Sequence, residues 1–276
     1  MKHLCFFIIV FLLSFSLFSE PYSTEPVNSE QFNPNGFSPE EFSQELKLAK
    51  EGAAIHQYNV AYAYQHGEGV AKNEAKALYW YTKAEQSNKP AVRYKIGRLY
   101  ETGNLLTKDI DKAVSNYQFA AKAGDPYAQA NLGVLYMQGR GVEKNIDKGL
   151  ELMTLAAEKY SLEAQVNLAN FYRTPGKYQD LDKSIHWFGL AAGGNSGYAQ
   201  IELGKYHLSI KKYDTAERLF TQATVNGMAE GYLMLAMMYD KGLGVARDIE
   251  LVKEYLLKAA NAGNKKAQQM IKQLTK

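Results

Sequence analysis

The chain has 276 residues, of which 46% are apolar, 22% charged and 12% aromatic, with 22 Gly, 7 Pro and one Cys. This composition excludes a disordered, a collagenous and a disulfide-built protein. The formal net charge of +3 is too small to indicate nucleic-acid binding, and Lys and Arg form no dense run. The 20 Tyr residues are an unusually high number that needs a cause.

The first 19 residues have the pattern of a secretory signal peptide. Lys2 precedes the apolar run Leu4–Leu13, and the residues that follow are mostly apolar. Such a run is shorter than the roughly 20 residues that a membrane-spanning helix needs. We therefore expect cleavage after Ser19 and export to the periplasm or out of the cell. The alternative is an uncleaved anchor, because Leu17 is large for a position so close to a cleavage site.

Residues 20–38 are rich in Pro, Ser, Asn and Glu, which predicts a disordered acidic leader. Residues 20–45 contain six Glu and no Lys or Arg. Without these six Glu and Lys2, the remainder has 31 basic and 23 acidic residues, a formal charge of +8. The leader is expected either to fold back on a basic groove or contact a partner, or to act as a solubilising spacer.

The rest of the chain is organised by a repeat of about 36 residues. A small residue follows an apolar one at regular intervals, in Val60-Ala61, Ile96-Gly97, Leu132-Gly133, Leu168-Ala169, Leu203-Gly204 and Leu235-Ala236. These small residues are separated by 36, 36, 36, 35 and 32 positions. Three positions after each comes Tyr, except in the fifth repeat, which has His207. Self-similarity at such a period predicts a solenoid of supersecondary units.

Each unit contains two amphipathic helical stretches joined by a turn. In the third repeat the apolar spacing predicts a first helix over 126–138 and a second over about 146–158. The turn Gly139–Val142 between them has two glycines that permit positive φ. Polar residues at the starts of four second helices are expected to be N-caps, namely Asn73, Asp109, Asp180 and Asp248.

Helices of this length are marginal alone, so stacking of neighbouring repeats must stabilise them. We expect an all-α, right-handed superhelical solenoid with six repeats over residues 53–264. Residues 39–52 are predicted to form an N-terminal capping helix and residues 265–276 a C-terminal one. The fifth repeat is four residues short and lacks the glycine turn.

The repeats resemble a known family. Residues 128–142 read Ala-Gln-Ala-Asn-Leu-Gly-Val-Leu-Tyr-Met-Gln-Gly-Arg-Gly-Val, and other repeats continue with Asp-x-x-Lys-Ala and end in Ala-Ala-x-x-Gly. This pattern is similar to the Sel-one-like repeat, a relative of the tetratricopeptide repeat, over roughly residues 53–276. In the fourth repeat Thr174–Lys177 replaces the glycine turn, and the fifth repeat drifts toward a tetratricopeptide-like turn. The resemblance implies an exported bacterial adaptor that binds other proteins.

The sequence shows no pattern for catalysis or for a cofactor. Removing the signal peptide removes Cys5, the only cysteine, and no nucleophile elbow is present. The remaining histidines lack the paired spacing of metal ligands, and His207 at the Tyr position is expected to be packed. The Gly-x-Gly turns lack the Gly-Lys-Ser/Thr of a phosphate loop. We therefore expect no enzyme, no cofactor, no metal site and no nucleic-acid partner.

Binding along the solenoid has a better basis. In tetratricopeptide-like solenoids the first helix of each pair lines the concave groove. By analogy, the positions facing that groove are Tyr58, Tyr62, His66, Tyr94, Arg98, Glu101, Met137, Asn170, Arg173, Lys205 and Met237. Aromatic, Met and basic side chains are typical of peptide-binding hot spots. Arg98, Arg173 and Lys205 would make the centre of the groove basic, which favours an acidic peptide.

These observations predict a non-enzymatic adaptor that binds another protein or peptide along the concave groove in the bacterial envelope or outside the cell, without stable membrane insertion after signal cleavage. Two alternatives remain open. The Tyr residues of the first two repeats could stack on a cell-wall glycan or a small ligand, or they could pack between adjacent first helices.

Overall fold

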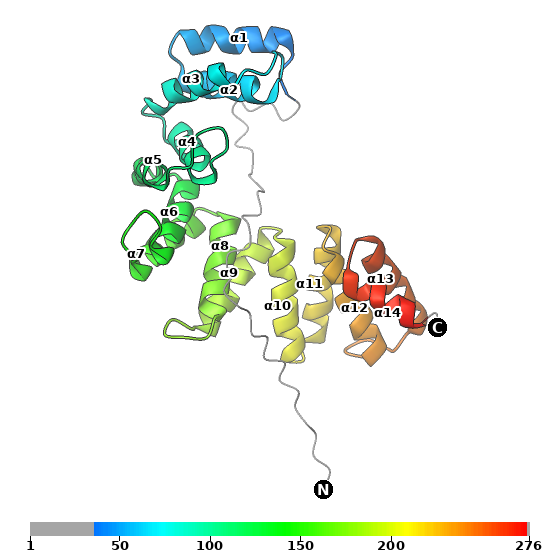
Figure 1. Cartoon of the computed structure of the whole chain (residues 1–276). Coiled ribbons are helices and arrows are strands. Elements are labelled where there is room, and N and C mark those ends of the chain that lie inside the picture. Colours follow the sequence, from blue (N-terminus) through cyan, green and yellow to red (C-terminus); the bar gives the residue numbers. More distant parts are fainter. Residues whose placement is uncertain (1–35, 275–276) are drawn as a thin grey trace. The chain divides into compact units, whose positions relative to one another are not determined.

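The computed structural model describes residues 36–274, and over this range the backbone forms fourteen α-helices and no strand (Figure 1). The predicted signal peptide and the acidic leader up to residue 35 lie outside the described residues. The helices are α1 (Pro39–Lys50), α2 (Ala54–His66), α3 (Glu74–Glu85), α4 (Pro90–Thr102), α5 (Ile110–Lys122), α6 (Pro126–Gln138), α7 (Ile146–Glu158), α8 (Leu162–Arg173), α9 (Leu181–Gly193), α10 (Gly197–Ser209), α11 (Tyr213–Val225), α12 (Ala229–Lys241), α13 (Ile249–Asn261) and α14 (Lys265–Leu274).

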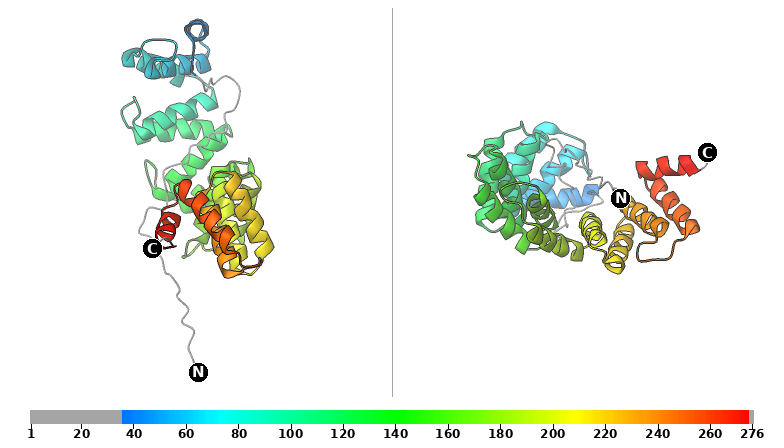
Figure 2. Two further views of the ribbon diagram at one scale, coloured as in Figure 1. Left: turned by 90° about the vertical axis from the view of Figure 1, so that its right-hand side faces the viewer. Right: turned by 90° about the horizontal axis from the view of Figure 1, so that it is seen from below.

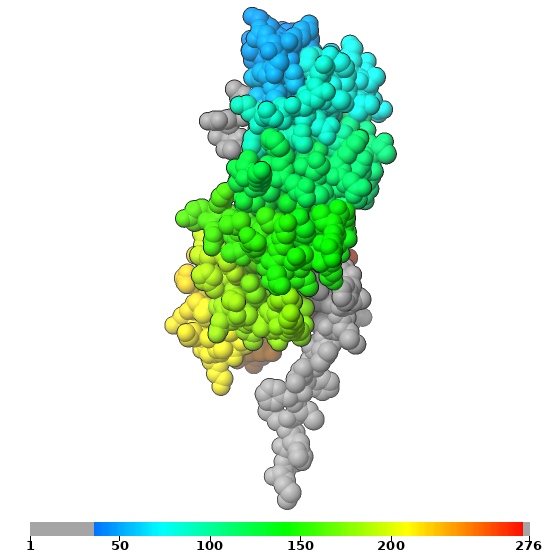
Figure 3. Space-filling model, turned by 90° about the vertical axis from the view of Figure 1, so that its left-hand side faces the viewer, coloured from blue at the N-terminus to red at the C-terminus, as the bar shows by residue number. Residues whose placement is uncertain are grey.

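The helices form six consecutive pairs, from α2 with α3 to α12 with α13. Extensive contacts join helices that are neighbours in the sequence, and α2 also touches α4. Figure 2 shows the pairs following one another along the chain, and Figure 3 shows consecutive repeats as adjoining layers. The expected all-α solenoid is confirmed. In the third repeat the two predicted helices coincide with α6 and α7.

Every helix is short. The longest have 13 residues, and no helix between residues 36 and 274 is long and apolar enough to cross a membrane. Helices of three to four turns are marginal in isolation, so contacts between neighbouring pairs must provide most of the stability.

The recurring Tyr holds the start of the second helix. In the third repeat the carbonyl of Tyr136 accepts a 2.8 Å hydrogen bond from the N–H of Asn145, the N-cap of α7. Lys148, three residues further on, places its Nζ 4.5 Å from the centroid of the Tyr136 ring, a cation–π contact. The same contact recurs at 5.0–5.1 Å in the pairs Tyr64–Lys76, Tyr100–Lys112 and Tyr172–Lys183. This arrangement accounts for a Tyr at one position of each of these repeats.

The four predicted N-caps are confirmed. The side chain of each cap accepts a hydrogen bond of 2.9 or 3.0 Å from a backbone N–H in the first turn of its helix. The four caps are Asn73, Asp109, Asp180 and Asp248. Asn145 makes the same contact with the N–H of Lys148, at 2.9 Å, although we did not single it out from the sequence. A side-chain acceptor at this position pairs an N–H that the helix leaves without a partner.

The small residue of each first helix allows the second helix to approach. A Cβ added at Gly97 would lie 2.7 Å from Cε1 of Tyr117, and one at Gly204 would lie 2.5 Å from Cε1 of Phe220. Both aromatic rings belong to second helices and are fully buried. The absence of a side chain at the small position therefore makes room for the largest residues of the core.

The solenoid ends in two further helices. On α1, Phe42 places its ring centroid 5.2 Å from that of Tyr64, and Glu45 accepts a 3.1 Å hydrogen bond from Asn59. On α14, Ala267 is buried, whereas Lys265 and neighbouring polar residues are exposed. Both helices thus pack one side on the adjoining repeat.

Candidate protein-binding surface

The eleven residues predicted to face the groove all lie on first helices, at equivalent positions of α2, α4, α6, α8, α10 and α12. We call the surface that they and their immediate neighbours form the first-helix face. Its side chains interact from one repeat to the next. Lys205 of α10, for example, reaches Glu230 of α12, and Arg173 of α8 reaches Glu202 of α10.

Two of the predicted tyrosines belong to the core. Tyr58 and Tyr94 are each only 8% exposed. The Tyr58 ring lies 5.3 Å from that of Tyr81 at a steep angle, and the Tyr94 ring stacks on Tyr127 at 5.6 Å. Tyr94 thus packs between the adjacent first helices α4 and α6, whereas the Tyr58 ring packs on Tyr81 of the second helix in its own repeat and lies 5.2 Å from Nζ of Lys95 on α4. Because both rings are buried, their faces are not available for stacking on a sugar.

Tyr62 and His66 form an accessible aromatic pair at the end of α2. Their rings stack at a centroid distance of 4.0 Å, and Nδ1 of His66 lies 3.0 Å from the Tyr62 carbonyl oxygen. Tyr62 is half-buried and His66 exposed. This pair offers apolar ring surface together with a polar edge.

Glu101 is held by a buried tyrosine. The hydroxyl of Tyr117 donates a 2.8 Å hydrogen bond to Oε2 of Glu101, and Arg140 from the next repeat pairs with Oε1 at 3.3 Å. Burial, followed by the charge of Glu101, raises the pKa of Tyr117, so the phenol stays protonated and donates. Glu101 is therefore fixed in position between two repeats.

Charged side chains of α8, α10 and α12 form a row of ion pairs. Arg173 pairs with Glu202, and Lys205 lies 2.9 Å from Glu202 and 2.8 Å from Glu230. Burial by itself would raise the pKa of Glu202, but the hydrogen bond and charge of Lys205, with those of Arg173, outweigh it and lower that pKa. Arg173 also donates to Oδ1 of Asn170 at 2.8 Å.

Arg98 is half-buried on α4 and lies near Glu163 of α8. Burial raises the pKa of Glu163, and the positive charge of Arg98 opposes that rise. Each of the three predicted cations thus has a carboxylate nearby. The basic centre expected from the sequence is instead a row of alternating charges.

The remaining predicted residues differ in accessibility. Met137 is buried among Ala130, Met153 and Leu168, whereas Met237 is half-buried. The acidic residues Glu163, Glu202 and Glu230 are the members of this face that sequence reasoning missed. Glu163 and Glu230 lie seven residues, about two helical turns, before Asn170 and Met237. Glu202 lies three residues before Lys205, the spacing of an ion pair within one helix, and this spacing could have found it.

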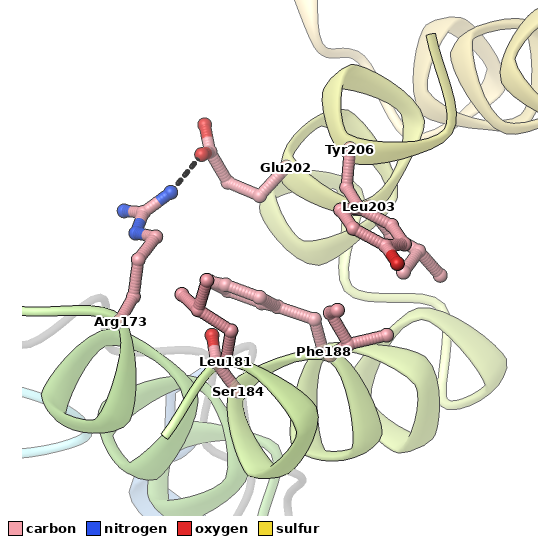
Figure 4. A pocket seen from close by; sticks show the side chains of 8 residues that line it. Arg173, Leu181, Ser184, Phe188, Glu202, Leu203 and Tyr206 are labelled. Atoms are coloured by element: carbon pink, nitrogen blue, oxygen red, sulfur yellow. Dashed lines mark hydrogen bonds and ion pairs between the residues drawn. The ribbon is translucent and has the colours of Figure 1, made fainter. Parts of the chain in front are cut away.

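An apolar cavity of about 90 Å³ adjoins the first-helix face between the fourth and fifth repeats (Figure 4). Leu181, Ile185 and Phe188 of α9 form one wall. On the other side lie residues of α10, and the Arg173–Glu202 pair closes one end. The full lining is Arg173, Leu181, Ser184, Ile185, Phe188, Glu202, Leu203 and Tyr206.

Between residues 36 and 274 no three His, Cys, Asp or Glu side chains gather in a way that could hold a metal ion. His207 is half-buried, and its Nδ1 is buried without a hydrogen-bond partner. His56 pairs with Glu45 of the capping helix at 2.9 Å.

The comparisons with known proteins agree with this architecture. A Sel1 repeat protein from Oxalobacter formigenes is similar at 32% identity and a TM-score of 0.73, over 86% of this chain and 70% of that one. A protective antigen of uropathogenic Escherichia coli strains, described as having an SLR fold, is similar at 28% identity and a TM-score of 0.74, over 82% of this chain. This chain spans half the length of the E. coli protein. No curated protein matches.

The Sel1 repeat family matches five stretches of the chain, residues 57–88, 90–125, 126–161, 162–196 and 229–264. The gap at 197–228 holds the fifth helix pair, α10 and α11, whose turn is shortened. This repeat keeps the two-helix fold but has lost the sequence pattern of the turn. With more than half of its residues matched, the chain belongs to the Sel1 repeat family.

Proposed function

We propose that the protein is a non-enzymatic adaptor that binds a partner protein or peptide along the first-helix face. The observation that carries this proposal is the series of half-buried and exposed side chains on first helices, which includes Tyr62 of α2, Arg98 of α4 and the ion-paired row from α8 to α12. Sel1 repeats mediate protein–protein interactions, and in this chain the series extends from the first helix pair to the sixth, with the α6 member, Met137, buried. A long surface without one deep site fits an extended segment of a partner.

The partner segment that fits this face carries carboxylates. Lys205 and Glu230 are 37% and 42% exposed, and an ion pair between exposed side chains contributes only about 0–1 kcal/mol. A carboxylate of the partner can therefore replace Glu230 at Lys205 at little cost, whereas Glu202, whose side chain is 12% exposed, keeps its cations. A glycan is a poorer ligand, because the Tyr58 and Tyr94 rings are buried.

We propose that the protein acts outside the cytosol, in the periplasm or as a secreted protein. The signal pattern of residues 1–19 supports this location. The similarity to a protective antigen of uropathogenic E. coli strains agrees with it.

Site-specific photo-crosslinking in living cells tests the surface. A photoreactive phenylalanine at Tyr62 should capture the partner, because this side chain lies on the first-helix face. The control is the same substitution at Tyr160, which is 85% exposed in the turn after α7. Equal capture from both positions, or capture from Tyr160 alone, would contradict binding of the partner at the first-helix face.

The charge requirement is tested on the captured partner. The triple variant Arg98→Gln, Arg173→Gln, Lys205→Gln should weaken binding at least tenfold in a titration, with a melting temperature within a few degrees of the wild type. Gln is chosen because it removes the charge without placing like charges next to Glu202.

The matched control neutralises three exposed lysines elsewhere on the chain, with Lys122→Gln, Lys144→Gln and Lys266→Gln. It lowers the net charge by the same amount, so any general electrostatic attraction is lost equally. Equal loss of binding in both triple variants would contradict a carboxylate-specific contact at the first-helix face.

A further inference from the structure

In the third, fourth and sixth repeats the turn contacts the start of the second helix of the preceding repeat. In the third repeat a Cβ added at Gly141 would lie 2.9 Å from Cγ1 of Ile110, the first residue of α5. In the fourth, the hydroxyl of Tyr178 donates a 3.2 Å hydrogen bond to Oδ1 of Asp147 on α7. Ile110 is half-buried as a result.

The turn of the sixth repeat makes the same contact with the preceding repeat. A Cβ added at Gly244 would lie 2.9 Å from Cγ of Tyr213, the first residue of α11, which is half-buried. Leu243 and Val245 of this turn belong to the same apolar cluster as Tyr213. The turns of the third and sixth repeats thus place apolar side chains, Val142 and Val245 among them, on the core at the repeat before them.

The turn of the fifth repeat does not make this contact. Only residues 210–212 separate α10 from α11, whereas residues 139–145 join α6 to α7. The turn is too short to reach α9, and Leu181, the first residue of α9, is 56% exposed. Ile249, the first residue of α13, is equivalent to Leu181. No further repeat turn follows α13 within the described residues, and Ile249 is 44% exposed.

The uncovered start of α9 opens into the cavity of about 90 Å³ described above (Figure 4). We call this cavity the α9–α10 notch. Leu181, Ile185 and Phe188 line it from α9, and Leu203 and Tyr206 from α10. An engineered cavity that holds benzene has about 150 Å³, so the smaller notch suits one branched aliphatic side chain.

We propose that the α9–α10 notch is a second docking site, which binds a turn of a partner protein that presents a single Val, Ile or Leu side chain. The chain itself provides the precedent, because turns of this kind fill the equivalent positions in other repeats. The partner turn covers the start of α9, which the shortened turn of the fifth repeat leaves exposed. This site shares the Arg173–Glu202 pair with the first-helix face, but Tyr62 and Lys205 are not part of its lining.

The test uses a cyclised peptide with the sequence of residues 138–145, Gln-Gly-Arg-Gly-Val-Glu-Lys-Asn, added to the full chain carrying labelled methyl groups. Val142 is the one branched apolar residue of this peptide. The methyl resonances of Leu181, Ile185 and Leu203 should shift in a saturable manner. A peptide in which Val142 is replaced by Ser should bind at least tenfold more weakly, because it lacks the branched apolar group.

Two variants of the protein complete the test. Leu181→Ser should weaken peptide binding at least tenfold, whereas Leu257→Ser, at a residue of α13 that is 54% exposed, should leave it unchanged. Both side chains are exposed enough for the fold to tolerate the change. Equal binding of the two peptides, or no effect of Leu181→Ser, would overturn the proposal. So would concentration-dependent shifts of the same methyl groups without peptide, because a second copy of the chain would then be the occupant.

Discussion

The Nζ atom of Lys205 lies 2.8 Å from Oε1 of Glu230, and this ion pair connects the first helix of the fifth repeat to that of the sixth. Lys205 also pairs with Glu202 at 2.9 Å, and Glu202 in turn pairs with Arg173 of the fourth repeat. One continuous row of charges therefore links three repeats, including the shortened one. The same groups form the part of the first-helix face that we propose for carboxylate binding.

Replacing Lys205 by Met should lower the free energy of unfolding by about 1 kcal/mol or less, because exposed ion pairs contribute little. The difference should shrink in 0.5 M salt, where such pairs are screened. Urea denaturation at low and high salt measures both effects. Lys253→Met, which removes an i,i+3 pair within α13, should have a smaller effect, and equal losses in the two variants would contradict a link between repeats.

The pH dependence of the Lys205→Met variant follows from Glu202. The pKa of Glu202 is held below its ordinary 4.5, so its stabilising contribution is complete above that pH and is lost as the pH falls through the lower pKa of the folded state. Without Lys205 the lowering is weaker. The acid side of the stability profile should therefore be flatter in the variant than in the wild type, and identical profiles would contradict this role of Lys205.

His207→Tyr should reduce the loss of stability between pH 7.5 and 5.5. Burial lowers the pKa of His207, and the charges of Lys212 and Arg218 lower it further. As the pH falls through 6.5 the unfolded chain takes up a proton that the folded chain resists, so stability declines. Thermal melts at the two pH values measure the difference. His186→Tyr, at an exposed position of α9, should leave the decline unchanged.

Gly97→Ala should destabilise the protein although Ala favours helix. The new Cβ would lie 2.7 Å from the buried ring of Tyr117, and such overpacking costs about 1–3 kcal/mol against a helix gain of about 1 kcal/mol. Gly189→Ala is the matched control, because a Cβ at this helical position of α9 meets nothing within 4 Å. It should raise the melting temperature, and a rise in both variants would contradict the close approach of α4 and α5.

The sequence period predicts the local structure of each repeat well, because the contacts that define it lie within about 36 residues. The helix bounds of the third repeat and the N-caps Asn73 and Asp109 depend on such local contacts. The register also places the candidate residues on the first helices. It does not reveal that Tyr94 is buried, because the ring that covers it, Tyr127, belongs to the next repeat.

At Arg173 the charge of the first-helix face was mispredicted for the same reason, whereas the pair of Lys205 with Glu202, three residues earlier on α10, is local. The position of Arg173 within its own repeat is clear from the sequence, but its partner Glu202 lies on the next first helix. The α9–α10 notch was not predicted either, since it arises from a turn that the following repeat lacks. Interactions between repeats depend on how the pairs stack, and a one-dimensional register does not contain that information.

Export is tested at the apolar run of residues 4–13, which precedes the described residues. Ile9→Arg places a charge in the middle of this run and should retain the protein in the cytosol, whereas Ile9→Leu preserves apolarity and should leave export unchanged. Cell fractionation measures the distribution, and mass spectrometry of the exported chain should show Glu20 as its first residue. A full-length chain in the membrane fraction of wild-type cells would instead establish the uncleaved anchor. Export of the Ile9→Arg variant would contradict a signal in this run.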